Sequence, residues 1–278
     1  MCLRTLWGHT KTGWNCMFDA LFDLPLWITG PGIVVVMISF GLGGMFLVRR
    51  RVLPRLQVHV QDSEFAGAMV QCVMVFYGLA VALIAVSVWQ TYSDVSTTVS
   101  REAIALGALY RDASSYPEPV RGALQTDLRE YVRQIIDEAW PLQQHGKVPT
   151  RGVEMIDDFQ KVLTAYEPAT EGQKLLHGET LRAYNQMVEA RRLRLDSVQT
   201  GLPSVMWVVI LVGAIIGLSS TFFFRVEDAR LHAILVTLLS TFMALVIFMI
   251  FALDRPYRGD LGVPSDPYQL IHDQLMKP

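Results

Sequence analysis

Four long runs without charged residues dominate the hydropathy pattern of the chain. Each is close to or above the roughly 20 residues that an α-helix needs to cross the hydrocarbon core of a bilayer, and each exceeds the usual length of an apolar run in a buried strand. We therefore predict four transmembrane helices, at Leu26–Val48, Ala66–Tyr92, Val205–Phe224 and Leu231–Leu253.

The second run continues into polar sequence without a signal that would end a helix. No charged residue occurs from Phe65 to Ser93, charges then return, and the first proline comes at Pro117. Because proline is the strongest helix-ending signal, we expect residues 65–113 to form one helix. Such a helix would be roughly 70 Å long, more than twice the thickness of the hydrocarbon core. It would carry the chain from the membrane into water.

The region between spans two and three, residues 93–204, has the pattern of a soluble helical domain. After Pro117 and Pro119, apolar side chains recur at the three- and four-residue spacing of an amphipathic helix; they are Val120, Leu124, Leu128, Tyr131, Val132, Ile135 and Trp140. Two further stripes follow, and no alternating strand pattern occurs. The predicted fold is an all-α membrane protein with four transmembrane helices and a helical soluble domain inserted between spans two and three.

The remaining segments are connections and ends. Residues 1–25 mix aromatic and charged side chains, as expected of a segment at a membrane interface, and residues 49–64 form an Arg-rich loop. The tail, residues 254–278, is rich in proline and glycine, which predicts turns and loop. A short amphipathic piece at Tyr268–Leu275 follows within it.

Composition agrees with a membrane protein. Charged residues make up 18% of the chain, below the roughly 25% of soluble domains. The net charge of −2 gives no reason to expect a nucleic acid or another polyanion as partner. Cys2, Cys16 and Cys72 form no CxxC pair, so neither a disulfide framework nor a zinc site is expected.

Aromatic and basic residues predict the orientation in the cell (inner) membrane. The side chains expected at one membrane face form an aromatic belt, namely Trp27, Trp89, Trp207 and Tyr257. The loop at the other face holds Arg49, Arg50, Arg51 and Arg55, which the positive-inside rule makes cytoplasmic. The soluble domain would then be extracytoplasmic. Three arginines before span three favour the opposite orientation, Arg191, Arg192 and Arg194.

Motifs for enzymatic chemistry are absent from the sequence. The chain contains no Walker loop, HExxH or GxSxG motif, so we expect no enzyme, no cofactor and no metal site. No acidic or basic residue lies deep in a span, which disfavours a proton-coupled transporter and an intramembrane protease.

One face of span two is built from small or polar residues. Its members recur at spacings of three, four and seven and are Gly67, Gln71, Gly78, Ala82 and Ala85. One interpretation is close helix packing, with Gly67 as its clearest case. The other is a pore-facing line in which Gln71 is the polar group and neighbouring Val and Phe side chains form a hydrophobic constriction. Span three contains Gly213-x-x-x-Gly217, which favours helix packing.

Five charged residues lie near the expected membrane boundaries. Asp254, Arg255 and Arg258 follow span four, and Arg101 and Glu102 lie just over three helical turns beyond Trp89. Each is either a local ion pair and anchor or a vestibule charge that concentrates ions.

The chain also resembles a known family through four segments in a fixed order. They are FYGLAVALIAVSVWQTY at Phe76–Tyr92, REAIALGALYRDA at Arg101–Ala113, YVRQIIDEAWP at Tyr131–Pro141 and LDRPYRG at Leu253–Gly259. As a set they look like the bestrophin-like family of mostly bacterial membrane proteins. The resemblance implies kinship with bestrophins, which are pentameric anion channels with four spans per subunit, a neck of apolar residues from the second span, and cytosolic soluble domains.

Two functions from different classes follow. The first is a homo-oligomeric ion channel in the lipid bilayer, with anions as the first candidate ions, span two lining the path and a pentamer as the assembly that the resemblance implies. The alternative is a membrane-anchored interaction or sensor module whose soluble helices bind a partner.

Overall fold

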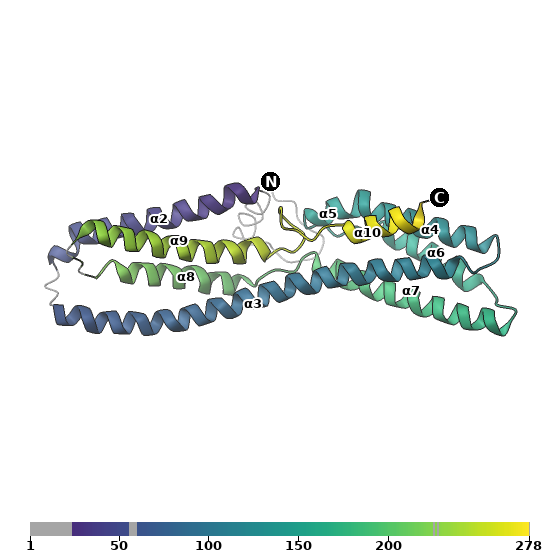
Figure 1. Ribbon diagram of the computed structural model, residues 1–278, viewed down its shortest axis with the longest axis horizontal. Coiled ribbons are helices and arrows are strands. Elements are labelled where there is room, and N and C mark those ends of the chain that lie inside the picture. The colour runs from purple at the N-terminus through teal and green to yellow at the C-terminus, as the bar shows by residue number, and fades with distance from the viewer. Residues whose placement is uncertain (1–23, 56–59, 225, 227, 278) are drawn as a thin grey trace. The chain divides into compact units, whose positions relative to one another are not determined.

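The computed structural model describes residues 24–55, 60–224, 226 and 228–277 (Figure 1). The predicted interfacial segment therefore lies outside the described residues, apart from its last two, as do Arg225 and part of the Arg-rich loop. Every element in the described part of the chain is helical, and no strand occurs there.

The helices, in chain order, have the following bounds. The longer ones are α2 Leu26–Arg51, α3 Val60–Ala113, α4 Val120–Gln134, α6 Gly152–Ala165, α7 Glu171–Ser197, α8 Ser204–Thr221 and α9 Ala229–Leu253. The shorter ones are η1 Leu53–Arg55, η2 Ile135–Ala139, α5 Trp140–Gln144, α10 Asp266–Ile271 and η3 His272–Met276. Four helices are long and apolar enough to cross a membrane, namely α2, α3, α8 and α9. This confirms the predicted all-α membrane protein with four spans.

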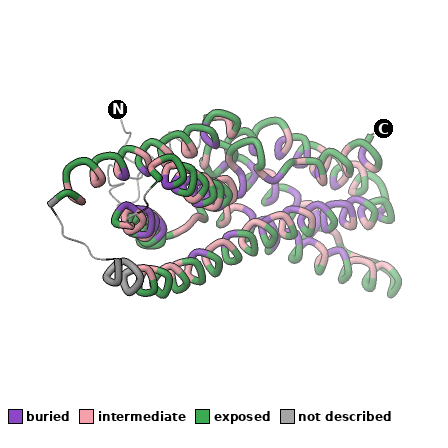
Figure 2. Tube along the Cα trace, turned by 60° about the vertical axis from the view of Figure 1, so that its left-hand side comes forward, coloured by how far each residue is buried: buried purple, intermediate pink, exposed green. Residues whose placement is uncertain are grey.

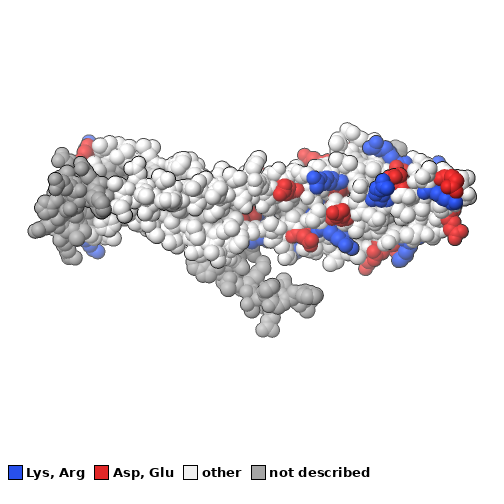
Figure 3. All heavy atoms as spheres, turned by 90° about the horizontal axis from the view of Figure 1, so that it is seen from below, with Lys and Arg blue, Asp and Glu red and all other residues white. Residues whose placement is uncertain are grey.

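The chain divides into two compact units, which are called the first and second unit below. The first holds residues 1–90 and 201–254, and the second holds residues 91–200 and 255–278. Helix α3 contributes to both, and it is continuous from Val60 to Ala113 as predicted. The charged side chains visible in Figure 3 gather over one part of the chain, while the apolar helices are almost free of them.

The first unit packs its membrane helices around an apolar core. Its buried side chains come from all four helices and are Met45, Val81, Val88, Trp207, Ile210, Ala214, Leu218, Phe222, Val236, Met243, Ile247, Ile250 and Phe251. Helices α2 and α9 approach closely because Gly41 lies directly against Ser240. Pro25 and Pro203 precede α2 and α8, consistent with the preference for proline at helix starts.

The ends of the first unit fit a four-span topology. The C-terminal Arg49 of α2 donates a hydrogen bond to the carbonyl of Val226 at 3.1 Å, so the end of α2 lies beside the loop between α8 and α9. Helix α9 begins with Asp228, whose side chain accepts a hydrogen bond from the amide of Arg230 at 2.8 Å. Such a cap satisfies an otherwise unpaired amide at the helix start.

The second unit has its own core beneath α3. The stripe predicted from the sequence is buried there, with Leu124, Leu128, Tyr131, Val132, Ile135 and Trp140 all in the core. Helix α7 begins with a capping box between Thr170 and Gln173. The tail is more ordered than its composition suggests, because α10 and η3 dock on this core and bury Tyr268 completely.

Candidate functional site

The small residues of α3 border an open groove in the first unit. Gly78, Ala82 and Ala85 line it on one side, and α9 forms the other wall. The groove has a volume of about 500 Å³, and its α9 side chains are Leu239, Phe242, Met243, Val246, Ile247 and Met249. No side chain of the described chain lies within 4 Å of an added methyl group at Gly78. The described residues therefore leave open space beside Gly78.

Gln71 and Gly67 lie toward the other end of the same face. Gln71 is exposed. An added methyl group at Gly67 would lie 3.4 Å from the ring of Phe224, which is ordinary contact distance. Neither residue is enclosed by the helices of its own unit.

Larger side chains, rather than these small ones, join α3 to α8. The Tyr77 hydroxyl donates to the carbonyl of Ile210 at 2.7 Å. An added methyl group at Gly213 would overlap the ring of Tyr77, and one at Gly217 would overlap the sulfur of Met74. The two glycines of α8 thus provide the space that bulky α3 side chains fill, as in close packing of membrane helices.

Most of the apolar surface of α3 in the first unit is left uncovered by the described residues of the chain (Figure 2). In its most apolar stretch only 6% of residues are buried, against 39% for α9. Phe76, Leu79 and Leu83 are 69%, 59% and 64% exposed, and they lie on the side of the helix away from Tyr77. So large an apolar face needs lipid or another protein surface to cover it.

Asp254, at the end of α9, is buried and fully engaged in the first unit. Its carboxylate accepts hydrogen bonds from the amide of Leu202 at 2.5 Å and from the indole of Trp207 at 3.3 Å. Leu202 lies just before α8, so the negative charge sits near the positive end of that helix dipole. Its structural role is to tie the end of span four to the start of span three.

The two arginines after span four bind backbone carbonyls of the second unit. Arg255 donates to the carbonyl of Gln199 at 3.3 Å, and Arg258 donates to that of His145 at 3.0 Å. Arg101, in contrast, is exposed on α3. Of the boundary charges predicted from the sequence, Arg101 therefore has the most access to water.

Glu102 occupies the centre of the second unit instead of its surface. Its side chain is completely buried and pairs with Arg194, whose Nε and Nη2 lie 2.5 and 3.1 Å from the two carboxylate oxygens. The hydroxyls of Tyr131 and Tyr268 donate to the same carboxylate at 3.2 and 3.0 Å. A vestibule charge must lie at a surface that water reaches. Glu102 is enclosed, so of its two expected roles the structure shows the local ion pair.

The tyrosines around this ion pair are strongly perturbed. Burial, with a smaller contribution from the Glu102 charge, raises the pKa of Tyr131 and Tyr268 well above their usual range. Burial also raises the pKa of Tyr257, which contacts Ser197 nearby, to about 12. All three remain neutral hydrogen-bond donors at any physiological pH.

No local sequence pattern predicted this cluster. Its members come from α3, α4, α7 and α10, and only the apolar stripe around Tyr131 indicated burial. Arg194 had counted as a surface charge in the orientation argument. Arg194 is buried against Glu102 and Arg191 is buried as well, so Arg192 is the exposed one of these three arginines.

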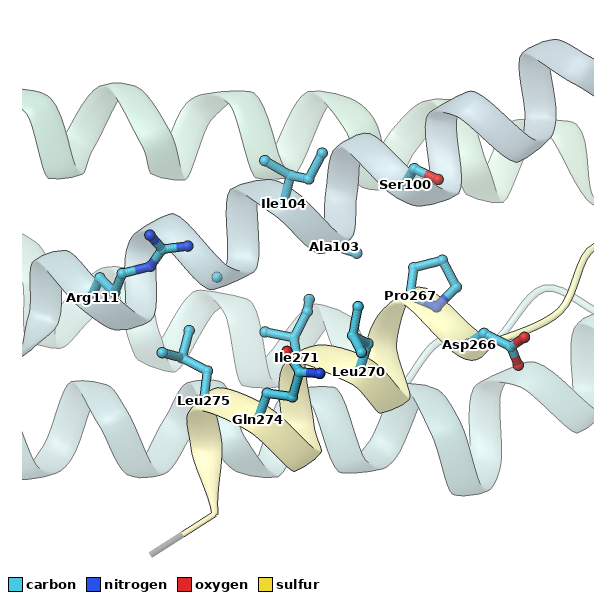
Figure 4. A pocket seen from close by; sticks show the side chains of 11 residues that line it. Ser100, Ala103, Ile104, Arg111, Asp266, Pro267, Leu270, Ile271, Gln274 and Leu275 are labelled. Atoms are coloured by element: carbon cyan, nitrogen blue, oxygen red, sulfur yellow. The ribbon is translucent and has the colours of Figure 1, made fainter.

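A second open groove lies in the second unit, between α3 and α10 (Figure 4). Its volume is about 690 Å³. Ile104 of α3 and Leu270 of α10 border it and are 71% and 56% exposed. Among the described residues, no group of three or more His, Cys, Asp or Glu side chains is placed to hold a metal ion.

Comparison with known proteins gives a family and a fold. The family model of the Bestrophin-like domain matches residues 35–268. A search of the curated proteins finds no match.

The solved structures that match include crystal structures of a bacterial Bestrophin homolog from Klebsiella pneumoniae, each carrying one mutation. One has a TM-score of 0.65 at 9% sequence identity and covers 86% of this chain and 96% of that chain. A second has a TM-score of 0.62 at 10% identity, covering 89% and 99%. A third has a TM-score of 0.61 at 11% identity, covering 88% and 96%. At these identities the likeness establishes the fold alone.

Proposed function

The chain belongs to the bestrophin-like family, and from this membership we propose that it forms a homo-oligomeric ion channel in which α3 lines the conducting path. The observation that carries the proposal is the exposure of α3, because only 6% of the residues in its most apolar stretch are buried among the described residues. A helix that lines a path in an assembly needs one face for the path and further faces for neighbouring copies. The kinship with bestrophins favours five copies.

We place Gln71 and Val75 at the path. Val75 is 64% exposed, and this side chain, repeated in several copies, would form a hydrophobic constriction. Gln71 supplies a polar group one helical turn away. Gly78, Ala82 and Ala85 then border the path in the groove beside α9, where their small size leaves room.

The charges near the membrane boundary favour anions. Both acidic candidates are engaged, Asp254 by an amide and an indole and Glu102 by Arg194. Arg101 is exposed. Repeated in each copy of a ring, it would raise the local concentration of anions.

The proposed location is the cell (inner) membrane with the second unit outside the cytoplasm. Three arginines, Arg49, Arg50 and Arg51, occupy the last turn of α2. They lie at the end of the first unit where α8 and α9 are joined, and the positive-inside rule makes that end cytoplasmic.

Reconstitution tests the function. Purified protein in liposomes is expected to pass chloride faster than protein-free vesicles, with a dependence on protein density. A protein that is oligomeric in mild detergent and passes neither anions nor cations above the protein-free control would contradict the proposal. A monomer without flux would favour the interaction or sensor module instead.

A further inference from the structure

The groove between α3 and α10 is an apolar surface that its own unit leaves open (Figure 4). Ala103 and Gly107 form its floor on α3, and an added methyl group at Gly107 would lie 3.5 Å from Ile271 of α10. Ile104 and Leu270 stand at its edge, 71% and 56% exposed. Two apolar side chains so exposed beside an unfilled groove mark a contact surface.

We propose that this groove is the docking surface for a second copy of the chain, which lays the outer face of its α7 there with Leu193 against Ile104 and Leu270. The proposal deepens the homo-oligomer of the proposed function and rests on it. Leu193 is 51% exposed, so it is available for such a contact.

The groove and α7 lie on opposite sides of α3 within the second unit, as Figures 1 and 4 show. On α3, Glu102 contacts Arg194 of α7, whereas Gly107 faces Ile271 of α10. Glu102 and Gly107 are five positions apart along α3, so the directions in which they face differ by about 140° around the helix. A ring of identical copies joins two different surfaces of the same subunit, one on each flank. The outer face of α7, on the flank away from the groove, is the surface that we assign to it.

The two surfaces also lie at the same level along the helices. Helices α3 and α7 run antiparallel, because Tyr116 just beyond α3 contacts His177 near the start of α7, while Glu102 contacts Arg194 near its end. Leu193 adjoins Arg194, and Ile104 is two residues from Glu102, or roughly 3 Å along the helix. Rotation about an axis parallel to α3 leaves the height of each residue along that axis unchanged. Leu193 of the second copy therefore lies at the height of Ile104.

Charges at one end of the two surfaces are complementary. Arg111 lines the groove near the C-terminal end of α3. Glu189 lies one turn before Leu193 on α7, and because the two helices are antiparallel, it is displaced from Leu193 in the same direction as Arg111 is from Ile104. Arg111 and Glu189 are both exposed, and neither makes an ion pair with another described residue. Opposite charges at the rim of a contact favour one register over others.

Mixed cysteine cross-linking tests the docking. Cys2, Cys16 and Cys72 are first replaced by serine; this chain then carries either Ile104→Cys or Leu193→Cys, each with its own tag. The two forms are co-expressed and oxidised in the membrane. We expect covalent dimers that carry both tags.

The matched control replaces Leu193→Cys by Leu175→Cys. Leu175 is 74% exposed on the same helix, but it lies about 27 Å from Leu193 along the helix axis. It should give no mixed dimer with Ile104→Cys. Arg111→Glu on the first chain should lower the yield of the Leu193 cross-link about two- to fivefold, and Glu189→Lys on the second chain should restore it.

The outcomes separate this proposal from the channel itself. Equal mixed-dimer yields with Leu193→Cys and Leu175→Cys, in a protein that is oligomeric and passes ions, would overturn the docking and leave the channel. A protein that is monomeric in detergent and silent in liposomes would overturn both.

Discussion

Glu102 on α3 and Arg194 on α7 form a two-point ion pair from which water is excluded. The side chains are 0% and 2% exposed, and their nitrogen–oxygen distances are 2.5 and 3.1 Å. Tyr131 from α4 and Tyr268 from α10 donate to the same carboxylate. One acidic side chain thus connects four elements of the second unit, and it fixes the tail to the long helix.

Removing one charge of this pair should destabilise the second unit strongly. Glu102→Gln leaves the guanidinium of Arg194 buried without a counter-charge, and such losses cost about 3–5 kcal/mol. The measurement is thermal or denaturant unfolding of the protein in detergent. The double variant Glu102→Leu with Arg194→Met should recover most of the loss, since no buried charge remains.

An exposed ion pair is the matched control for this prediction. Arg121 and Glu118 lie 2.7 Å apart with about half of each side chain exposed, so Glu118→Gln should change the free energy of unfolding far less than Glu102→Gln does. Equal losses for Glu102→Gln and Glu118→Gln would show that the buried pair has no special role.

Stability should fall in alkali because of the buried tyrosines. Burial raises the pKa of Tyr257 from 10.0 to about 12, and it raises that of Tyr131 and Tyr268 as well. The folded state therefore holds these protons more tightly than the unfolded state. Their contribution to stability is complete below pH 10 and is lost as the pH rises toward 12 and above.

Ultraviolet titration of tyrosinate together with unfolding curves tests this. Some tyrosines of the folded protein should ionise only above the pH at which the unfolded chain does. Tyr257→Phe should flatten the loss of stability between pH 10 and 12. A Tyr257→Phe variant with the same pH dependence as the parent chain would contradict the assignment.

The sequence predicted the membrane helices well because hydropathy is a local property. The predicted span Leu26–Val48 became α2, and the expected continuation of span two into polar sequence is confirmed by α3. Glu102 illustrates what remained hidden. Its partner Arg194 is 92 residues away along the chain, and nothing in either local pattern distinguishes a buried ion pair from two surface charges.

The same limit applies to the faces of α3. The small residues from Gly67 to Ala85 suggested a packing face, but the contact with α8 is made by Tyr77 and Met74, whose space comes from glycines on α8. Helical periodicity shows which residues of α3 share a face. It does not show which face contacts α8, because that also depends on the side chains of α8.

Packing between α3 and α8 should be sensitive to a single methyl group. Gly213→Ala places a methyl group where the ring of Tyr77 lies, and overpacking of this kind typically costs about 1–3 kcal/mol. The control is Gly43→Ala on α2, where the added methyl group has no atom of another described segment within 4 Å. Thermal unfolding in detergent should be lowered by the first change only. An unchanged unfolding temperature in Gly213→Ala would contradict the contact between Gly213 and Tyr77.

The side of the membrane that holds the second unit can be tested at Ser114. This residue is exposed at the end of α3. In a cysteine-free background, Ser114→Cys should react with a membrane-impermeant maleimide in intact cells if the unit is extracytoplasmic, as the arginines of α2 suggest. A cysteine replacing Arg50, in the last turn of α2, is the opposite control and should react only after the membrane is opened. Reversal of this pattern would make the second unit cytosolic.

Gln71 should influence ion selectivity if it faces the path. Its side chain is exposed within an apolar stretch, so a charge introduced there would be repeated around the path in a medium of low polarity. Gln71→Lys is expected to raise the permeability ratio of chloride to potassium by about tenfold, and Gln71→Glu to lower it similarly, because like charges are excluded. The ratio is measured from reversal potentials in planar bilayers. Gln144, an exposed glutamine on α5, is the matched control and should tolerate both changes. Shifts in the same direction for Lys and Glu would indicate altered helix packing, and they would remove Gln71 from the path.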